Sequence, residues 1–179
     1  KLNGFDGLWG VEYKSNHKQA ISGFVLEYYQ TTNQSGPMHG LDFSEVKKTG
    51  GADDYYNNDW YPGWVHWGMS MANPLIASPI YNKDGDMTFK YNRVRAMHLG
   101  WSGDISSEWT YLAKLSYNKT WGTPFKPIPD ILENFSTFAS IIYTPRKWKG
   151  WRFNASIAFD TGEIYGDNLG CQLKVRKIF

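Results

Sequence analysis

The amino-acid sequence predicts an all-β protein that forms part of an antiparallel transmembrane β-barrel. Three observations support this fold class: strict two-residue alternation, connections that alternate between short and long, and aromatic residues near both ends of the predicted strands. No apolar run approaches the roughly 18 to 20 residues that a membrane-spanning helix needs. A barrel strand needs only about 9 to 11 residues with apolar and polar positions alternating, so this sequence is compatible with it.

Three segments carry the alternation most clearly. Trp151–Asp160 and Glu108–Asn118 each place apolar side chains at every second position, with polar side chains predominating between them. From Asn168 to Phe179, Leu169, Cys171, Leu173 and Val175 alternate with polar residues and glycine, and the chain printed here stops on a phenylalanine. We predict a strand in each segment. Cys171 shares the phase of the apolar face and is expected to be inert.

Four weaker segments raise the predicted number of strands to about seven: Gly7–Lys14, Ala20–Thr32, Thr88–Trp101 and Phe135–Thr144. In the third of these, Arg93 and Arg95 fall in phase with apolar residues, which breaks the pattern unless a bulge shifts the register. The fourth is apolar on both faces, so its orientation stays open.

The connections between these strands are predicted to alternate in length. The short ones lie near 15–19, 102–107 and 145–150, and the longer ones at 33–86, 119–134 and 161–167. Outer-membrane barrels have short periplasmic turns and longer extracellular loops. This pattern therefore predicts the periplasmic side for the short turns and the cell exterior for the others.

Aromatic residues are placed as two girdles would require. One predicted ring borders the short turns and the other borders the opposite strand ends: Trp101, Trp109, Tyr143 and Trp151, then Tyr117, Trp121, Phe135 and Phe159. Eight residues at about 3.3 Å each, with a tilt near 40°, span roughly 20 Å. The apolar band of such barrels is about 25 Å tall and flanked by aromatic girdles.

Seven strands do not make a complete barrel, because bacterial single-chain barrels have even strand numbers and open edges are not tolerated in lipid. We therefore expect the remaining strands to come from an N-terminal part of the same polypeptide or from another chain. The competing fold is a soluble antiparallel barrel or sandwich, whose inward apolar faces produce the same alternation.

Composition excludes several classes of protein. A formal charge of +2 is too mild for a nucleic-acid-binding surface, and a single Cys cannot form an intramolecular disulfide. The charge is unevenly distributed: residues 33–86 hold three basic and seven acidic residues, whereas residues 87–179 hold thirteen and seven. An acidic middle segment thus precedes a basic remainder.

The densest candidates for a binding site lie in the long segment 33–86. Aromatic faces stack on sugar rings, and Asp and Asn side chains hydrogen-bond hydroxyl groups. The candidate carbohydrate-binding residues are Asp53, Asp54, Tyr55, Tyr56, Asn57, Trp60, Trp64, His66 and Trp67. The alternative is that these side chains pack the loop over the barrel mouth, because loops of this length are either functional or ordered by their own side chains.

Other chemistry is less well supported. Asp53, Asp54 and Asp59 match no defined calcium or glycosidase spacing. His98 and Ser116, with Asn118 nearby, form a Ser–His–Asn set of the membrane phospholipase type, but no local motif surrounds them. No His, Cys or carboxylate cluster has metal-ligand spacing, so no metal, cofactor or catalytic residue is expected.

Four basic residues share the polar, lumen-facing phase of the predicted strands: Lys114, Arg152, Lys174 and Arg176. A basic lumen would attract an acidic polysaccharide. The alternative is that these side chains are solvated, as polar lumen residues usually are.

Five runs carry a resemblance to a known family: Ile21–His39, Ala52–Asn58, Gly68–Leu75, Ser78–Asn82 and Asn92–Gly100. In this order they resemble the Wzi family of capsule-assembly proteins, in a Bacteroides-type form. The resemblance implies an eighteen-stranded outer-membrane barrel that is plugged by its outer loops and acts as a lectin for capsular polysaccharide. Residues 1–179 would then be the C-terminal portion of a single barrel domain, with a long extracellular segment near 33–86.

The sequence thus predicts a non-enzymatic protein of the bacterial outer membrane. Its expected partners are capsular polysaccharide, outer-membrane lipid and the remaining barrel strands, with no nucleic acid. Two rival functions stay open: a channel for sugars or other solutes, and an outer-membrane enzyme of the phospholipase type.

Overall fold

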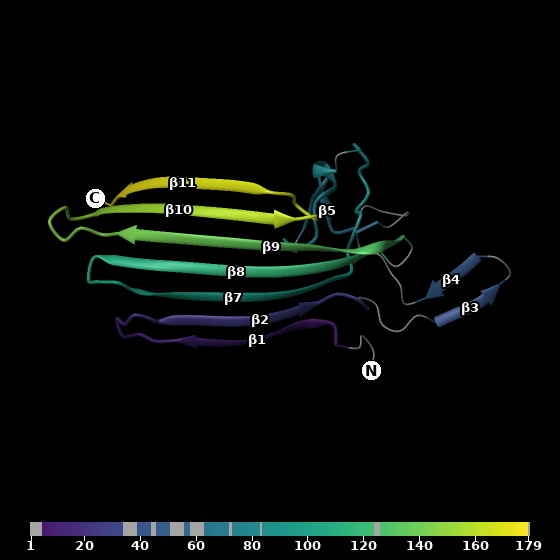
Figure 1. Cartoon of the computed structure of the whole chain (residues 1–179), viewed down its shortest axis with the longest axis horizontal. Coiled ribbons are helices and arrows are strands. Elements are labelled where there is room, and N and C mark those ends of the chain that lie inside the picture. The colour runs from purple at the N-terminus through teal and green to yellow at the C-terminus, as the bar shows by residue number, and fades with distance from the viewer. Residues whose placement is uncertain are drawn as a thin grey trace. The chain divides into compact units, whose positions relative to one another are not determined.

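The computed structural model describes residues 5–33, 39–43, 46–50, 56–57, 63–71, 73–82, 84–123 and 126–178. Its main element is one sheet of seven strands in the order β1-β2-β7-β8-β9-β10-β11 (Figure 1). The strands are β1 (Gly7–Lys14), β2 (Gly23–Gln30), β7 (Val94–Asp104), β8 (Trp109–Gly122), β9 (Pro127–Tyr143), β10 (Trp151–Gly162) and β11 (Asn168–Lys177). The predicted all-β class with seven strands in the main sheet is confirmed. Within the described residues β1 and β11 are the outer strands and do not pair with each other, so this sheet is open.

Smaller elements lie in the segment between β2 and β7. Two hairpins, β3 (His39–Phe43) with β4 (Val46–Gly50) and β5 (Val65–His66) with β6 (Met69–Ser70), are followed by the 3-10 helix η1 (Pro79–Tyr81). No helix in the described part of the chain is long and apolar enough to cross a membrane.

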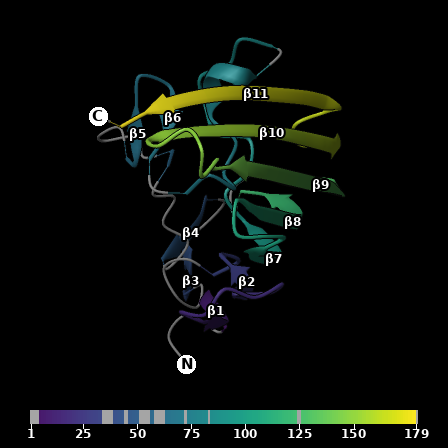
Figure 2. The same cartoon turned by 90° about the vertical axis from the view of Figure 1, so that its left-hand side faces the viewer.

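The chain divides into two compact units, which are described separately. Unit 1 comprises Lys1–Leu8, Tyr29–Ala96 and Asn118–Glu133, and unit 2 comprises Trp9–Tyr28, Met97–Tyr117 and Asn134–Phe179. In unit 2, β10 lies between β9 and β11 and is antiparallel to both (Figure 2).

The predicted alternation of short and long connections is wrong, although the connection expected at 161–167 lies within two residues of its predicted place. β8 and β9 continue through most of 119–134 and leave only residues 123–126 between them, and β10 leaves only 163–167 before β11. At the end of β8, Gly122 has φ +79° and a Cβ there would lie 2.6 Å from the Lys126 carbonyl oxygen, so the turn requires glycine. The polar residues of 119–134 break the apolar alternation, but backbone pairing does not depend on it, and the strands continue. Among the connections between the described strands of the main sheet, only the one between β2 and β7 is long.

The third predicted strand begins later than expected, and this resolves the position of its arginines. β7 starts at Val94, so Arg93 precedes the strand. Its backbone pairs with β8, because the Arg93 N–H donates to the Gly122 carbonyl at 3.1 Å and the Trp121 N–H donates to the Arg93 carbonyl at 3.1 Å. The Arg95 guanidinium lies 5.0 Å from the centre of the Trp121 ring. Arg95 is therefore held by a cation–π contact at the strand end. The Asn92 N–H also donates to the Gly122 carbonyl, at 3.2 Å, so two successive residues oppose Gly122, as in the bulge that the sequence pattern allowed for.

The buried hydrophobic cluster is small and belongs to unit 1. Ile76, Phe89 and Val94 are almost completely buried, and Tyr56, Val65 and Leu75 pack against them. This cluster holds the segment after β6 against the start of β7.

Candidate functional site

The sheet of unit 2 has one apolar and one polar face. Residues directly opposite each other in adjacent strands lie on the same face, and the register pairs Ala155 with both Leu173 and Ile141. The apolar face therefore includes Tyr143, Ile141 and Ala139 of β9, Phe153, Ala155, Ile157 and Phe159 of β10, and Val175, Leu173, Cys171 and Leu169 of β11. The orientation of β9, which the sequence left open, is decided by this register.

Several apolar side chains of the main sheet are exposed, while some of its polar side chains are buried. Ile157, on the apolar face of the inner strand β10, is 52% exposed, whereas the polar Asn134 of β9 is 1% exposed. An exposed apolar face and buried polar groups are the informative exceptions to the usual distribution. The apolar face of unit 2 is thus available to an apolar environment.

The aromatic residues near the 144–150 turn form a continuous cluster on this face. The Trp109 and Tyr143 rings stack with centroids 4.5 Å apart, and the Tyr143, Trp148 and Trp151 rings lie 6.2, 6.0 and 6.1 Å from the Phe153 ring. The structure thus brings together three members of the first predicted girdle and adds Trp148 and Phe153. Of the second, Trp121 lies beneath the Arg95 guanidinium.

The opposite face of unit 2 carries the predicted basic residues. Arg152 and Arg176 are directly opposite each other, and Asn154 is opposite Lys174. These side chains line a hollow of about 420 Å³ together with Leu112, Phe138, Ser140, Ile142, Ser156 and Gln172. Lys114 lies outside this lining, but its ammonium group is 5.9 Å from the centre of the Phe138 ring. The structure therefore groups three of the four predicted basic residues and places the fourth nearby.

A second hollow on unit 2, of about 490 Å³, contains the candidate Ser–His pair. The His98 Nδ1 and Ser116 Oγ atoms are 2.8 Å apart, and Glu27 and Lys114 line the same hollow. Within the described residues no carboxylate hydrogen-bonds the His98 ring, and a nucleophilic serine needs a base that is itself oriented by a third group. Asn118, the expected third member, is almost completely buried in unit 1. The pair is present, but it is not a complete triad.

The β5–β6 hairpin of unit 1 presents three of the predicted carbohydrate-binding residues. Trp67 is 86% exposed at its tip and Trp64 is 52% exposed beside it, while His66 is exposed and meets the Trp67 ring edge-on at 6.3 Å. Trp67 and Gly68 have φ values of +51° and +71°, as a two-residue turn with the hand of a hairpin requires. A bulky residue in this conformation is strained. The chain therefore holds a tryptophan at a position that favours Gly or Asn.

This hairpin is anchored to the residues around η1. The Ile80 N–H donates to the Gly68 carbonyl at 3.2 Å, and the Ser70 N–H donates to the Ser78 hydroxyl oxygen at 2.9 Å. A Cβ at Gly68 would lie 2.5 Å from the Met87 terminal methyl carbon. The turn is therefore held at its base while its aromatic side chains remain exposed.

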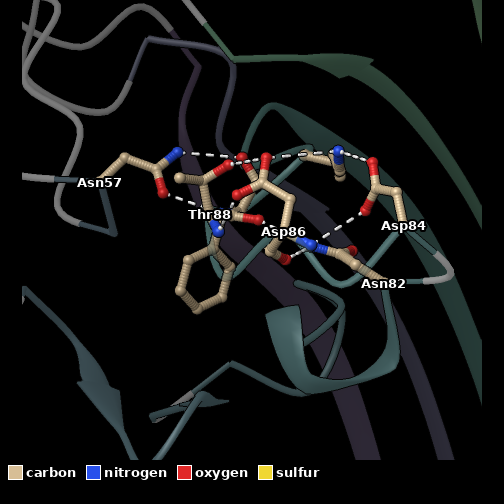
Figure 3. Close-up of polar contacts among 7 residues, drawn as sticks. Asn57, Asn82, Asp84, Asp86 and Thr88 are labelled. Carbon is tan, nitrogen blue, oxygen red and sulfur yellow. Dashed lines mark hydrogen bonds and ion pairs between the residues drawn. The ribbon is translucent and has the colours of Figure 1, made fainter.

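The side chains of Tyr56 and Asn57 contact Phe89 within the protein. The Tyr56 ring lies 4.9 Å from the Phe89 ring, and the Asn57 amide bonds the Phe89 backbone twice, donating at 2.9 Å and accepting at 2.8 Å (Figure 3). For these two residues the geometry favours the packing interpretation. Four further candidates, Asp53, Asp54, Tyr55 and Trp60, lie outside the described residues.

A polar network that sequence reasoning did not single out precedes Phe89. The Lys90 ammonium lies 2.6 Å from an Asp84 carboxylate oxygen and 3.4 Å from one of Asp86, and Asp86 also accepts hydrogen bonds from the Thr88 backbone and hydroxyl (Figure 3). The Lys90 hydrogen bond lowers the pKa of Asp84, and the Thr88 hydrogen bonds lower the pKa of Asp86. In the sequence, the Asp-Gly-Asp run of residues 84–86 indicates a turn at this place.

No group of side chains in the described part of the chain has the geometry of a metal site. The chain matches no family model, no curated protein and no solved structure.

Proposed function

We propose that this chain spans the bacterial outer membrane as part of a β-barrel and holds capsular polysaccharide at the cell surface by binding it without catalysis. The observation that carries the binding proposal is Trp67, which is 86% exposed at the tip of an anchored and strained hairpin. The resemblance to the Wzi family agrees with this function.

The membrane part of the proposal is supported by the apolar face of unit 2. Its exposed side chains, Leu173 and Ile157 among them, would face lipid, and the polar face with Arg152 and Lys174 would face a water-filled lumen. The stacked rings of Trp109 and Tyr143 would form part of an interfacial girdle. Because unpaired backbone groups are costly in lipid, the outer strands of this sheet would pair with further strands to close the barrel.

The glycan-binding part rests on the chemistry of the hairpin. Trp rings offer large, rigid apolar faces, and sugar rings stack on such faces while their hydroxyl groups bond nearby polar side chains. His66 supplies a polar ring beside Trp67, which it meets edge-on. Anchoring by Ile80 and Ser78 reduces the ordering cost of binding, because the turn is already formed.

The test replaces both exposed tryptophans of the hairpin in the full-length protein. Trp64→Ala with Trp67→Ala should release capsule from cells into the medium, while total polysaccharide and the heat-modifiable migration of the folded barrel stay unchanged. Trp148→Ala is the matched control, because Trp148 is also exposed but lies in the 144–150 turn.

A third variant distinguishes the loss of the Trp67 ring from a change in the hairpin backbone. Trp67→Asn keeps a residue that accepts positive φ and so should preserve the hairpin, yet it removes the stacking face and should release capsule as the alanine variant does. Capsule retention that is unchanged in both Trp67 variants of a correctly assembled barrel would remove the binding proposal.

A further inference from the structure

The polar face of β10 and β11 carries a concentration of positive charge that the hairpin site does not explain. The guanidinium-bearing residues Arg152 and Arg176 stand directly opposite each other, and Lys174 is two residues from Arg176 on the same face. Directly opposite positions bring Cβ atoms to about 4.5–5.5 Å, and positions two apart along a strand are separated by about 7 Å. The three cations therefore lie within reach of one extended ligand.

No carboxylate partner of these three cations is found in the part of the chain that the structure describes. Within the described residues none of the three forms an ion pair, and the lining of their hollow contains no carboxylate. Like charges directly opposite each other destabilise a strand pair. A bound anion would reverse this cost.

The remaining lining suits a saccharide. Asn154, Ser156, Gln172 and Ser140 present amide and hydroxyl groups, and the Asn154 amide already donates to the Ser140 hydroxyl at 2.8 Å. Such groups both donate and accept, which matches sugar hydroxyls. Phe138 adds an aromatic surface at one side of the hollow.

Guanidinium groups form two parallel hydrogen bonds with a carboxylate, which gives geometry as well as energy. We propose that this hollow, with Arg152, Lys174 and Arg176, is a binding site for the carboxylate groups of an acidic, uronate-type saccharide. This inference rests on the proposed function, because it specifies the charge of the polysaccharide that the protein holds.

The test measures binding by the full-length protein in detergent. The probes are an oligogalacturonate and a neutral maltodextrin of equal length, titrated calorimetrically in 50 and 300 mM NaCl. Oligogalacturonate should bind about tenfold more weakly in the higher salt, because counter-ions screen the cations, and maltodextrin binding should not depend on salt. A salt-independent affinity for oligogalacturonate would overturn the proposal without any variant.

Two double variants with the same change in net charge locate the site. Arg152→Gln with Lys174→Gln should weaken oligogalacturonate binding about tenfold or more, because it removes two charge-assisted contacts. Lys147→Gln with Lys149→Gln, in the exposed 144–150 turn, should change it less than twofold. If both double variants lose the same affinity for oligogalacturonate, the effect is one of overall charge and the hollow is not a site. If the Arg152, Lys174 variant loses no affinity, the hollow is not a site either.

The Trp64→Ala, Trp67→Ala variant distinguishes this inference from the proposed function. If this variant no longer binds either probe while the Arg152, Lys174 variant still binds oligogalacturonate, the binding site is the hairpin and not the hollow. If the hairpin variant still binds both probes and retains capsule on cells, the proposed function fails, regardless of the affinities measured for the two charge variants.

Discussion

Ala155 lies near the middle of β10 on the apolar face, where arginine should be strongly destabilising if this face meets lipid. Ala155 is four residues from both Trp151 and Phe159 and faces Leu173 and Ile141 in the neighbouring strands. Four residues at about 3.3 Å with a tilt near 40° place it roughly 10 Å from each of these two aromatic residues along the membrane normal, which is close to the centre of an apolar band about 25 Å tall that such residues flank.

Arginine near the bilayer midplane of a barrel costs about 2–4 kcal/mol. Ala155→Arg should therefore lower the free energy of unfolding from lipid vesicles by about this amount, measured by guanidinium titration with tryptophan fluorescence. On a surface that faces water the same change would stay within about 0.5 kcal/mol.

The adjacent Ser156→Arg is the control, because Ser156 lies opposite Gln172 and Ser140 on the polar face. Repulsion from the basic residues there should cost less than about 1 kcal/mol. Equal costs at the two positions would refute the assignment of the faces and, with it, the membrane proposal.

Two further predictions concern the segment between β2 and β7. The depressed pKa values of Asp84 and Asp86 mean that their contribution to local stability is present above their ordinary pKa of 3.8 and is lost as the pH falls through the lower values of the folded state. The protection of amides near Phe89, measured as hydrogen exchange relative to the intrinsic rate at each pH, should thus fall below about pH 3.8 in the wild type and depend less on pH in Asp86→Asn. If the segment plugs the barrel mouth, the full-length protein in a planar bilayer should carry little steady current, and deletion of 53–67 should open it. Large steady conductance in the wild type would instead favour the channel function.

Local patterns predicted much of the fold. Strand alternation located β1 at its observed bounds and β10 and β11 to within two residues of theirs, because side chains alternate between the two faces in every strand, whatever the strand's partners. The same reasoning failed at 119–134, where β8 and β9 continue through polar residues such as Lys119 and Thr120. There the pairing of the two backbones extends the strands, and a single segment does not reveal its partner.

The candidate site was predicted by residue type, and the structure separated its members by what they contact. Composition alone marked Tyr56, Asn57, Trp64 and Trp67 as equivalent candidates for carbohydrate binding. The first two are committed to Phe89, and the last two are exposed at an anchored hairpin. Sequence could not distinguish them, because the positive φ of Trp67 and the position of Phe89 depend on residues distant in the chain.

The sequence by itself determined that this chain forms strands with an apolar and a polar face, since a period of two follows from backbone geometry. It also determined that basic residues share the polar face. Only the tertiary structure decided which residues face each other: Arg152 opposite Arg176, Ala155 opposite Leu173, and β9 with Ile141 on the apolar side. The physical reason is that register is set by the fit of neighbouring strands, and a slip of one residue would exchange every side chain between the two faces.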